Sequence, residues 1–385
     1  VDMYPDSYAE RLTLAQDGAF YANRFEDSLG QVKASIVPQF AGMGIGLYLQ
    51  GIIQLGLDQP KQAIASFEQS RRAGYRGGDI YYAYAYAAQR EFSAAETMLR
   101  EGKRTGVQTA DLDAAYGRML VAVDQGKFDD ALRIARGSRD IALAREPLII
   151  GGEWRVRALA TELLAGHMTQ EQAKNALLGE VAQAEASARH TDELYSGFSE
   201  IMVLGLGYMG ARMDDPQVVG RALAAVAKSP DVAAYPLLAQ MQQVLLAEQE
   251  RLNNQPDAAI RRLMPIASRK DGLIAAHAAL LRAARKGDRQ TIALEQARWL
   301  SSHRGRAYVE GNAAGLPTVM NIADIGLADL QAAEAHAARG DGRRASDALR
   351  RFTLAWPIEA MPIALRRRVA ALGGYGEVFK RNVIA

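Results

Sequence analysis

The feature that most limits how this chain can fold is an internal repeat in its N-terminal third. Four segments align without gaps, each with a small residue at the same point: NRFEDSLGQV, DQPKQAIASF, REFSAAETML and GKFDDALRIA, which carry Ser28, Ala63, Ala95 and Ala131. The steps between those residues are 35, 32 and 36 positions. A period in this range is typical of stacked helical repeats, because one unit cannot bury its apolar face alone.

The repeat carries a pattern of side-chain sizes as well as a period. Four positions after the small residue come Val32, Phe67, Leu99 and Ala135. Two helices that cross closely need small residues at the crossing point, and a larger residue can then fill the gap toward the next repeat. We therefore expect each repeat to be a pair of antiparallel helices, with Ala63 and Ala95 buried at the crossings.

This pattern resembles the tetratricopeptide repeat (TPR), whose period is about 34 residues. Gly51, Ala63 and Phe67 form the best copy. The resemblance implies an all-α superhelical solenoid of stacked antiparallel helix pairs. From this resemblance we expect about four TPR-like repeats in residues 1–140 and irregular, degenerate TPR-like helix pairs in residues 141–303. In residues 304–385 we expect a loop insert, a closing TPR-like pair and a C-terminal capping helix.

Composition narrows the class of protein. Hydrophobic residues make up 49% and charged residues 23% of the 385 residues, as in ordinary folded chains. The absence of cysteine excludes disulfides, thiolate metal sites and cysteine nucleophiles. A net charge of +2 makes nucleic-acid binding an unfavoured reading.

The compartment is left open by the sequence. The longest apolar stretch, Ile201–Ala211, falls far short of the ~20 residues that a membrane helix needs. No signal-peptide pattern is visible, and because the chain starts with Val1 we expect a processed protein or part of a longer one. Either the cytoplasm or the periplasm suits such a chain.

Two features of the middle region are specific enough to test. Thr169 and Gln172 have the spacing of a capping box, in which each side chain satisfies a backbone N–H of the other residue. The stretch Arg304–Asn321 is rich in glycine and contains a proline, so we expect a loop between the last two helix pairs.

The chain contains the sequence motif of a dinucleotide-binding site, but the secondary structure expected around it does not fit such a site. GLGYMG contains Gly205, Gly207 and Gly210, but a nucleotide site needs a strand before it and a βαβ unit around it. The preceding residues read as a helix, which favours a packing role for these glycines. No metal-binding spacing joins any of the five histidines, and no hydrolase, kinase or P-loop motif occurs. We expect no cofactor, no metal and no catalysis, with an enzyme assembled from scattered residues as the alternative.

The last ~130 residues carry a second resemblance. They look like the closing repeats of modular bacterial signalling and regulatory proteins, which append a TPR region to a protein kinase, winged-helix or nucleotide-cyclase domain. The matching residues are His303, Arg304, Gly305, Gly326, Leu327, Ala328, Gly340, Asp341, Phe352 and Trp356. No kinase, winged-helix or cyclase motif lies in the chain, so no such activity transfers.

Aromatic side chains suggest where a partner binds. First helices of TPR-like repeats line a concave groove, and tyrosine provides contact area together with a hydroxyl group. The expected groove residues are Tyr21, Tyr48, Ile52, Tyr84, Tyr116 and Leu120. The competing interpretation is that these rings pack between adjacent repeats.

Charge is uneven along the chain. Residues 1–60 carry three basic and seven acidic residues, and residues 339–385 carry ten basic and four acidic ones. A basic surface for an acidic partner would use Arg343, Arg344, Arg350, Arg351, Arg366, Arg367 and Arg368. The alternatives are solvated outer helix faces and head-to-tail contact between two copies of the chain.

These observations predict a non-catalytic protein-interaction module with a regulatory or sensory role. It would bind a peptide or a partner helix in the concave groove. The alternative is a structural scaffold of a bacterial envelope assembly, such as one for secretion or polysaccharide export.

Overall fold

A computed structural model describes residues 8–36, 43–75, 79–101, 110–147, 149–188, 198–311 and 318–373. Within these ranges the chain forms α-helices joined by short turns, and no β-strand occurs. The all-α repeat architecture expected from the sequence is confirmed. None of the described helices combines the length and apolar character needed to cross a bilayer.

The N-terminal part consists of four helix pairs. In chain order the helices are α1 (Tyr8–Ala22), α2 (Phe25–Ser35), α3 (Met43–Gly56), α4 (Pro60–Arg72), α5 (Asp79–Ala88), α6 (Phe92–Glu101), α7 (Ala110–Asp124) and α8 (Phe128–Arg145). Each odd-numbered helix packs against the even-numbered helix that follows it, and each pair contacts the next pair.

The remaining chain continues the pairing with interruptions. Its helices are α9 (Ile150–Ala165), α10 (Gln170–Ala188), α11 (Phe198–Arg212), α12 (Pro216–Val226), α13 (Pro230–Ala234), α14 (Pro236–Leu252), α15 (Pro256–Ala267), α16 (Ile274–Lys286), α17 (Gln290–Ser302), α18 (Arg304–Ala307), α19 (Thr318–Ala338), α20 (Gly342–Ala355) and α21 (Ile363–Ala371). The short helices α13 and α18 interrupt the alternation. A 3₁₀ turn at Ile358–Ala360 precedes α21.

The turn inside each helix pair has one recurring conformation. A residue with positive φ lies between the two helices at Asn23, Asp58, Arg90, Gly126, Gly166, Asp214, Asn254, Asp288 and Gly340. Asn, Asp and Gly adopt this left-handed region at the lowest cost, which explains most of the residue types found there. The nine positions mark nine helix pairs in the described part of the chain.

Small residues at the crossings behave as the repeat pattern predicts. Ala63 and Ala95 are fully buried. A Cβ atom added to Gly51 would lie 2.5 Å from the ring of Phe67, so the helices α3 and α4 can approach closely only because residue 51 is glycine. This confirms the expected register of the repeats.

The glycine-rich motif GLGYMG lies inside a helix. Gly205, Gly207 and Gly210 all belong to α11, and a Cβ on Gly207 would lie 2.7 Å from the Cβ of Ala222 in α12. The predicted role in helix packing is confirmed for Gly207 and Gly210, whose added Cβ atoms would overlap residues of α12. The predicted capping box is also present, since the backbone N–H of Thr169 donates to Gln172 Oε1 at 2.9 Å and that of Gln172 donates to Thr169 Oγ1 at 3.2 Å.

The expected loop over Arg304–Asn321 is only partly correct. Residues 304–307 form α18, residues 308–311 are in turn conformation, and α19 already begins at Thr318. The rest of the predicted loop, residues 312–317, lies outside the described residues. The loop prediction relied on glycine content. However, Gly305 is required for close packing, because a Cβ at that position would lie 2.6 Å from the backbone oxygen of Leu55.

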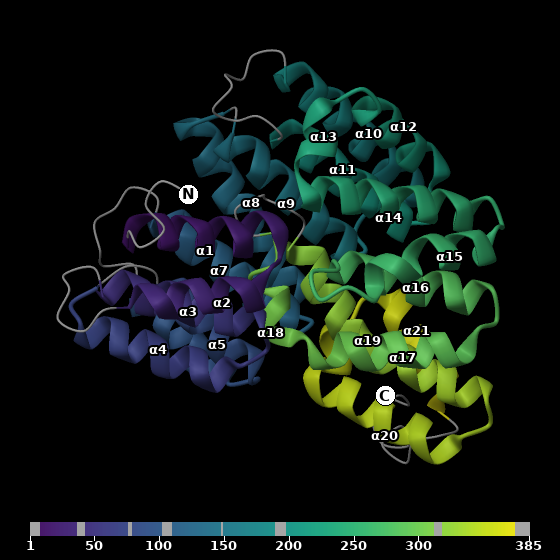
Figure 1. Ribbon diagram of the computed structural model, residues 1–385. Helices are drawn as coiled ribbons and strands as arrows, with labels where there is room; N and C mark the ends of the chain where they lie inside the picture. The colour runs from purple at the N-terminus through teal and green to yellow at the C-terminus, as the bar shows by residue number, and fades with distance from the viewer. Residues whose placement is uncertain are drawn as a thin grey trace.

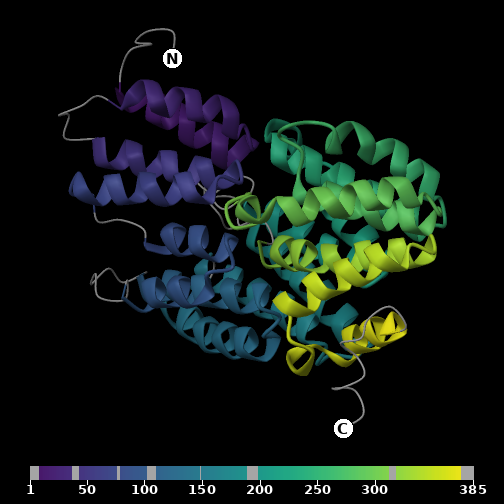
Figure 2. The ribbon, with the colours of Figure 1, turned by 90° about the horizontal axis from the view of Figure 1, so that it is seen from below.

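The superhelix curls so that α14, α18 and α19 contact helices of the N-terminal half. Figure 1 shows α1–α5 on one side, α14–α17 on the other and α18 between them. Figure 2 shows the green segment around α18 reaching from the C-terminal half toward the N-terminal helices. Direct contacts agree, since α18 touches α3 and α5, α19 touches α7 and α9, and α1 touches α14.

Candidate functional site

The inner surface of the N-terminal repeats is covered by a segment of the same chain. We call residues 304–311 the insert segment. Its helix α18 lies against α3 and α5, the first helices of the second and third pairs. The surface that the sequence predicts as a partner-binding groove is therefore in contact with residues from the C-terminal part of the chain.

Tyr308 is the aromatic anchor of the insert segment. Its ring stacks on that of Tyr84, with centroids 4.8 Å apart, and its hydroxyl donates to Asp124 Oδ2 at 2.6 Å. Burial raises the pKa of Tyr308 well above its usual value. The hydroxyl therefore remains protonated and available as a donor at physiological pH.

Asp124, at the end of α7, receives three contacts from the C-terminal part. The Arg304 guanidinium donates to both carboxylate oxygens, at 2.9 and 2.8 Å, beside the bond from Tyr308. The indole N–H of Trp356 donates to the Asp124 backbone oxygen at 2.9 Å. A buried carboxylate is tolerated only when it is paired and hydrogen-bonded, and Asp124 meets both conditions.

Arg306 fixes the insert segment to two other elements. Its backbone N–H donates to Asp58 Oδ1 at 3.1 Å. Its guanidinium donates to the backbone oxygens of Lys270 and Gly272 and to Glu310 Oε2, at 3.0, 2.6 and 2.9 Å. Every guanidinium nitrogen thus has an acceptor, which allows this arginine to be almost completely buried.

Three of the predicted groove residues are buried, contrary to the expectation that they are exposed. Ile52, Tyr84 and Leu120 occupy equivalent places in their helices, and Tyr84 is only 1% exposed. Tyr308 covers Tyr84, while α18 packs on the helix of Ile52 and α19 on the helix of Leu120. The repeats were correctly placed, but their inner surface is occupied by the chain itself.

The other predicted groove residues are partly accessible. Tyr48 is half-buried among Phe67, Tyr75 and Tyr81, with ring centroids 5.1–5.9 Å apart. Tyr116 is half-buried, and the Arg157 guanidinium lies 4.2 Å from its ring centroid. Tyr21 is 41% exposed near the N-terminal end.

The inner surface of the C-terminal repeats is filled with paired charges. Tyr208 donates to Asp324 Oδ2 at 2.6 Å, and Arg212 pairs with the same carboxylate. Arg282 pairs with the buried Glu248 at 2.6 Å. Burial lowers the pKa of Arg212 to about 10, which leaves it charged at neutral pH. No group of three or more His, Asp or Glu side chains in the described ranges is placed to hold a metal ion.

The predicted arginine surface divides into paired and unpaired members. Arg344, Arg350, Arg351 and Arg368 form ion pairs with Asp341, Asp347, Asp329 and Glu334 respectively. Arg343, Arg366 and Arg367 are exposed and have no carboxylate partner within the described residues. They share their helices, α20 and α21, with the exposed apolar side chains of Leu354 and Ile363.

Sequence reasoning missed Asp124 and Tyr308. The only signal for them was the run of arginines and an aromatic residue in RGRAYVEG, inside a stretch that otherwise has the composition of a loop. A lone aspartate at the end of a helix carries no sequence signal for its partners, because Arg304 and Tyr308 lie far away along the chain.

Comparisons with known proteins add little to this description. No model of a protein family and no curated protein matches the chain. The crystal structure of the P58(IPK) TPR domain is similar over 96% of this chain and 98% of that one, with 11% sequence identity and a TM-score of 0.26. This identity and this TM-score are too low to support an argument from the other structure. The assignment of the fold therefore rests on the helix pairs of this chain. The resemblance to modular bacterial proteins stays a prediction.

Proposed function

We propose that the chain is a non-catalytic protein-interaction module that binds a partner segment on the inner surface of its N-terminal repeats. The observation that carries this proposal is the insert segment, which this surface already holds as repeat proteins hold a bound peptide. Side chains from three repeats contribute, namely those of Asp58, Tyr84 and Asp124. A surface with these contacts has the chemistry to accept another segment of the same kind.

The contacts define the partner chemistry. An arginine would donate to both carboxylate oxygens of Asp124, and an aromatic residue four positions later would stack on Tyr84. In a helical partner these two side chains lie on the same face. Charge-assisted arginine contacts and buried aromatic rings often dominate binding energy.

The insert segment occupies the binding surface and would thereby regulate access of a partner to it. A covalently attached segment competes at a high effective concentration, so a partner segment must displace it or bind after it has been released. We infer that the surface is closed in the structure described here and opens when the insert segment leaves.

A peptide-binding experiment on the full chain tests this function. A labelled peptide with the sequence of residues 302–311 is titrated into wild type and into the Arg304→Ala/Tyr308→Ala variant, and fluorescence anisotropy is recorded. We expect saturable binding to the variant and at least tenfold weaker binding to wild type. A peptide with alanine in place of its arginines and tyrosine is the ligand control. Circular dichroism must show that the variant keeps its helical content, and a folded variant that ignores the peptide would contradict the proposal.

The unpaired arginines support a second candidate surface. Arg343, Arg366 and Arg367 lack carboxylate partners within the described ranges, and Leu354 on α20 is 77% exposed. We propose that they contact an acidic partner. Binding of a partner there should weaken steeply with salt and fall on substitution of these three arginines, while substitution of the paired Arg350 should matter less.

A further inference from the structure

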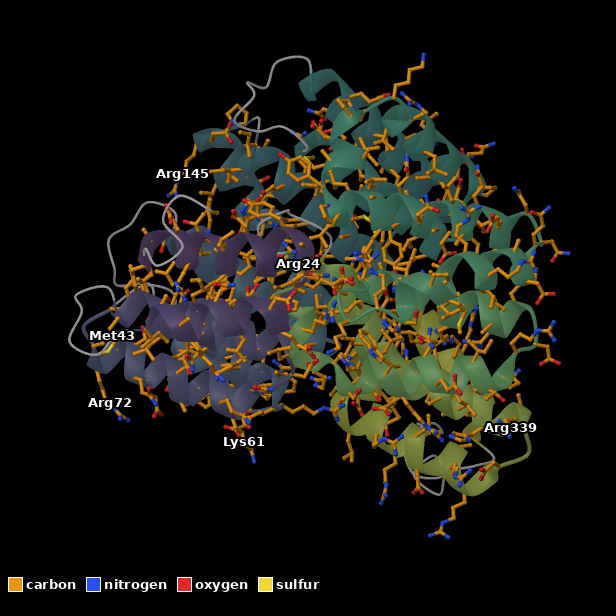
Figure 3. All side chains as sticks on the ribbon, in the orientation of Figure 1. Arg24, Met43, Lys61, Arg72, Arg145 and Arg339 are labelled. Carbon is orange, nitrogen blue, oxygen red and sulfur yellow. The ribbon has the colours of Figure 1, made fainter. Side chains whose placement is uncertain are left out.

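A cavity of about 580 Å³ lies between the N-terminal helix pairs and the C-terminal half. One wall comes from the turns after α1 and α3, and the opposite wall comes from residues 267–271 and from the end of α17. Figure 3 shows Arg24, a lining residue, at the boundary between the N-terminal helices and the C-terminal half. The volume is typical of a small-molecule site.

Asp58, in the turn after α3, uses only one of its carboxylate oxygens. Its Oδ1 accepts from the backbone N–H of Arg306 at 3.1 Å, and no hydrogen bond of the described residues uses Oδ2. Burial raises the pKa of Asp58 to about 7, because nearby N–H groups and Arg306 offset the loss of solvation only in part. The ionised carboxylate therefore lacks a full set of partners.

His303 presents a second unused acceptor to the same cavity. Its Nδ1 lies 2.7 Å from the Trp299 backbone oxygen, which can only accept, so the ring proton is on Nδ1. Burial lowers the pKa of His303, which keeps the ring neutral at physiological pH. The ring stacks on that of Trp299 with centroids 3.7 Å apart, and this contact holds its orientation. Nε2 is thus left with a lone pair.

The two unused acceptor atoms lie near each other and can be reached from the cavity. Asp58 Oδ2 and His303 Nε2 are 3.8 Å apart, too far for a direct hydrogen bond, but a single nitrogen can lie about 2.9 Å from both. The two side chains line the cavity and are 17% and 28% exposed. Neither atom belongs to the fully buried polar atoms without a partner, so each retains accessible surface.

The charges of the lining favour a cation. Three lining cations form ion pairs at 2.5–2.9 Å, namely Lys270 with Glu26, Arg269 with Asp271 and Arg306 with Glu310. Within the described residues, the charged lining groups outside these pairs are Arg24, Asp27 and Asp58. When Asp58 is ionised, these three carry one negative charge in excess. The half-buried side chains of Leu57 and Ala267 add apolar surface for an alkyl chain.

We propose that this cavity binds a small organic cation with a primary ammonium group, which donates one N–H to Asp58 Oδ2 and another to His303 Nε2. An ammonium group has three donors and no acceptor, so it satisfies both atoms and supplies the missing positive charge. A water molecule would bridge the two atoms but would leave the carboxylate without a counter-ion. The site uses neither Tyr84 nor Asp124, so it is independent of the partner segment proposed above.

The test compares three probes with the same butyl chain. n-Butylammonium has the charge and the N–H donors, butyltrimethylammonium has the charge without the donors, and n-butanol has a donor without the charge. Saturation-transfer NMR titrations with the full chain are carried out at pH 8, where Asp58 is ionised. We expect saturable binding of n-butylammonium and at least tenfold weaker binding of each comparison probe. A crystal soaked with n-butylammonium should show its nitrogen between Asp58 Oδ2 and His303 Nε2.

Two variants and a control locate the binding. Asp58→Asn removes the charge and keeps the left-handed turn, because asparagine tolerates the φ of 57°. It should weaken n-butylammonium binding at least tenfold. His303→Phe removes Nε2 and keeps a ring against Trp299, and it should also weaken binding. Asp288→Asn is the matched control, with φ of 56° in the turn of another helix pair and no place in the cavity lining. It should leave binding unchanged.

Several results would overturn the proposal. They are binding of either comparison probe as tight as that of n-butylammonium, no saturable binding of n-butylammonium, unchanged binding by folded Asp58→Asn, or a soaked crystal with ordered water only between the two acceptor atoms. If Asp58→Asn does not fold, as judged by circular dichroism, the comparison of the three probes on wild type decides alone.

Discussion

Arg304 Nη2 donates to both carboxylate oxygens of the buried Asp124, at 2.9 and 2.8 Å, and this ion pair joins the insert segment to the fourth helix pair. Tyr308 shares the same carboxylate, and Trp356 binds the backbone oxygen of the same residue. Contacts from three positions in the C-terminal part therefore converge on one residue at the end of α7. The closed form of the superhelix therefore depends strongly on the contacts that Asp124 makes.

Removing the carboxylate should be costly. Asp124→Ala leaves the Arg304 guanidinium buried without its counter-ion, and breaking a buried pair in this way typically costs about 3–5 kcal/mol. Urea denaturation should show a loss of unfolding free energy in this range. Asp347→Ala is the control, because its pair with Arg350 is exposed and worth about 0.5 kcal/mol. Similar losses for both variants would contradict the role assigned to Asp124.

Two glycine-to-alanine substitutions should change the stability of the protein in opposite directions. A methyl group on Gly326 would overlap the ring of Trp356, so Gly326→Ala should destabilise the protein by about 1–3 kcal/mol. Gly137 lies inside α8 with no atom near its added Cβ position, so Gly137→Ala should stabilise by roughly 0.5–1 kcal/mol. Thermal unfolding measures both, and destabilisation by Gly137→Ala would contradict an open, helical position for residue 137.

The register of the repeats predicts that substitutions at the adjacent residues Gln62 and Ala63 have different effects on stability. Ala63 is fully buried at the crossing of α3 and α4, so Ala63→Phe should overpack it and cost about 1–3 kcal/mol. Gln62, one position earlier, is exposed, and Gln62→Phe should change stability by no more than about 0.5 kcal/mol. A neutral Ala63→Phe, measured by urea denaturation, would mean that the register is wrong.

Ala63 and Tyr84 illustrate what the sequence can and cannot predict. The burial of Ala63 follows from a pattern within one repeat, where both helices are a few residues apart in the chain. The burial of Tyr84 depends on Tyr308, which arrives from another part of the fold and leaves no periodic trace. The solenoid could thus be predicted locally, whereas the occupation of its inner surface could not. The same reasoning applies to the cavity of about 580 Å³ that Asn23 and His303 line, since the two residues come near each other only because the superhelix curls.

The ionisation of Asp58 should make the unfolding free energy depend on pH. Its pKa is raised to about 7 by burial, compared with about 4 in an unfolded chain, so between these values the folded state holds a proton that the unfolded state releases. This contribution is present below pH 4 and is lost as the pH rises through 7, by up to about 1.4 kcal/mol per pH unit.

Asp58→Asn isolates this contribution from that of other groups. Burial lowers the pKa of His277 to about 3, which gives a contribution of opposite sign that is lost as the pH falls below about 6.5. That contribution is common to wild type and Asp58→Asn, so it cancels in the difference between their denaturation curves from pH 4 to 8. A difference that does not change with pH would contradict the raised pKa of Asp58.

Release of the insert segment should be visible to trypsin. Arg306 is buried in wild type and the Arg304 side chain is only 14% exposed, so cleavage after them requires local opening. Tyr308→Ala removes the stacking on Tyr84 and one hydrogen bond to Asp124, which increases the population of the open segment. Because cleavage tracks the open population when opening is fast, we expect at least tenfold faster cleavage after Arg304 and Arg306, measured by mass spectrometry.

The comparison of cleavage sites within one molecule separates local from global opening. Arg282 on α16 has a side chain that is only 16% exposed and pairs with Glu248 and Asp324. Within the described residues, none of its hydrogen bonds or ion pairs involves the insert segment. Its cleavage rate in Tyr308→Ala should stay close to that of wild type if only the insert segment opens. Tyr235→Ala, which alters a partly exposed tyrosine before α14, should change neither rate. If cleavage after Arg282 rises in parallel with that after Arg304, then the segment leaves only when the whole protein unfolds, and the inner surface could not open to a partner as proposed.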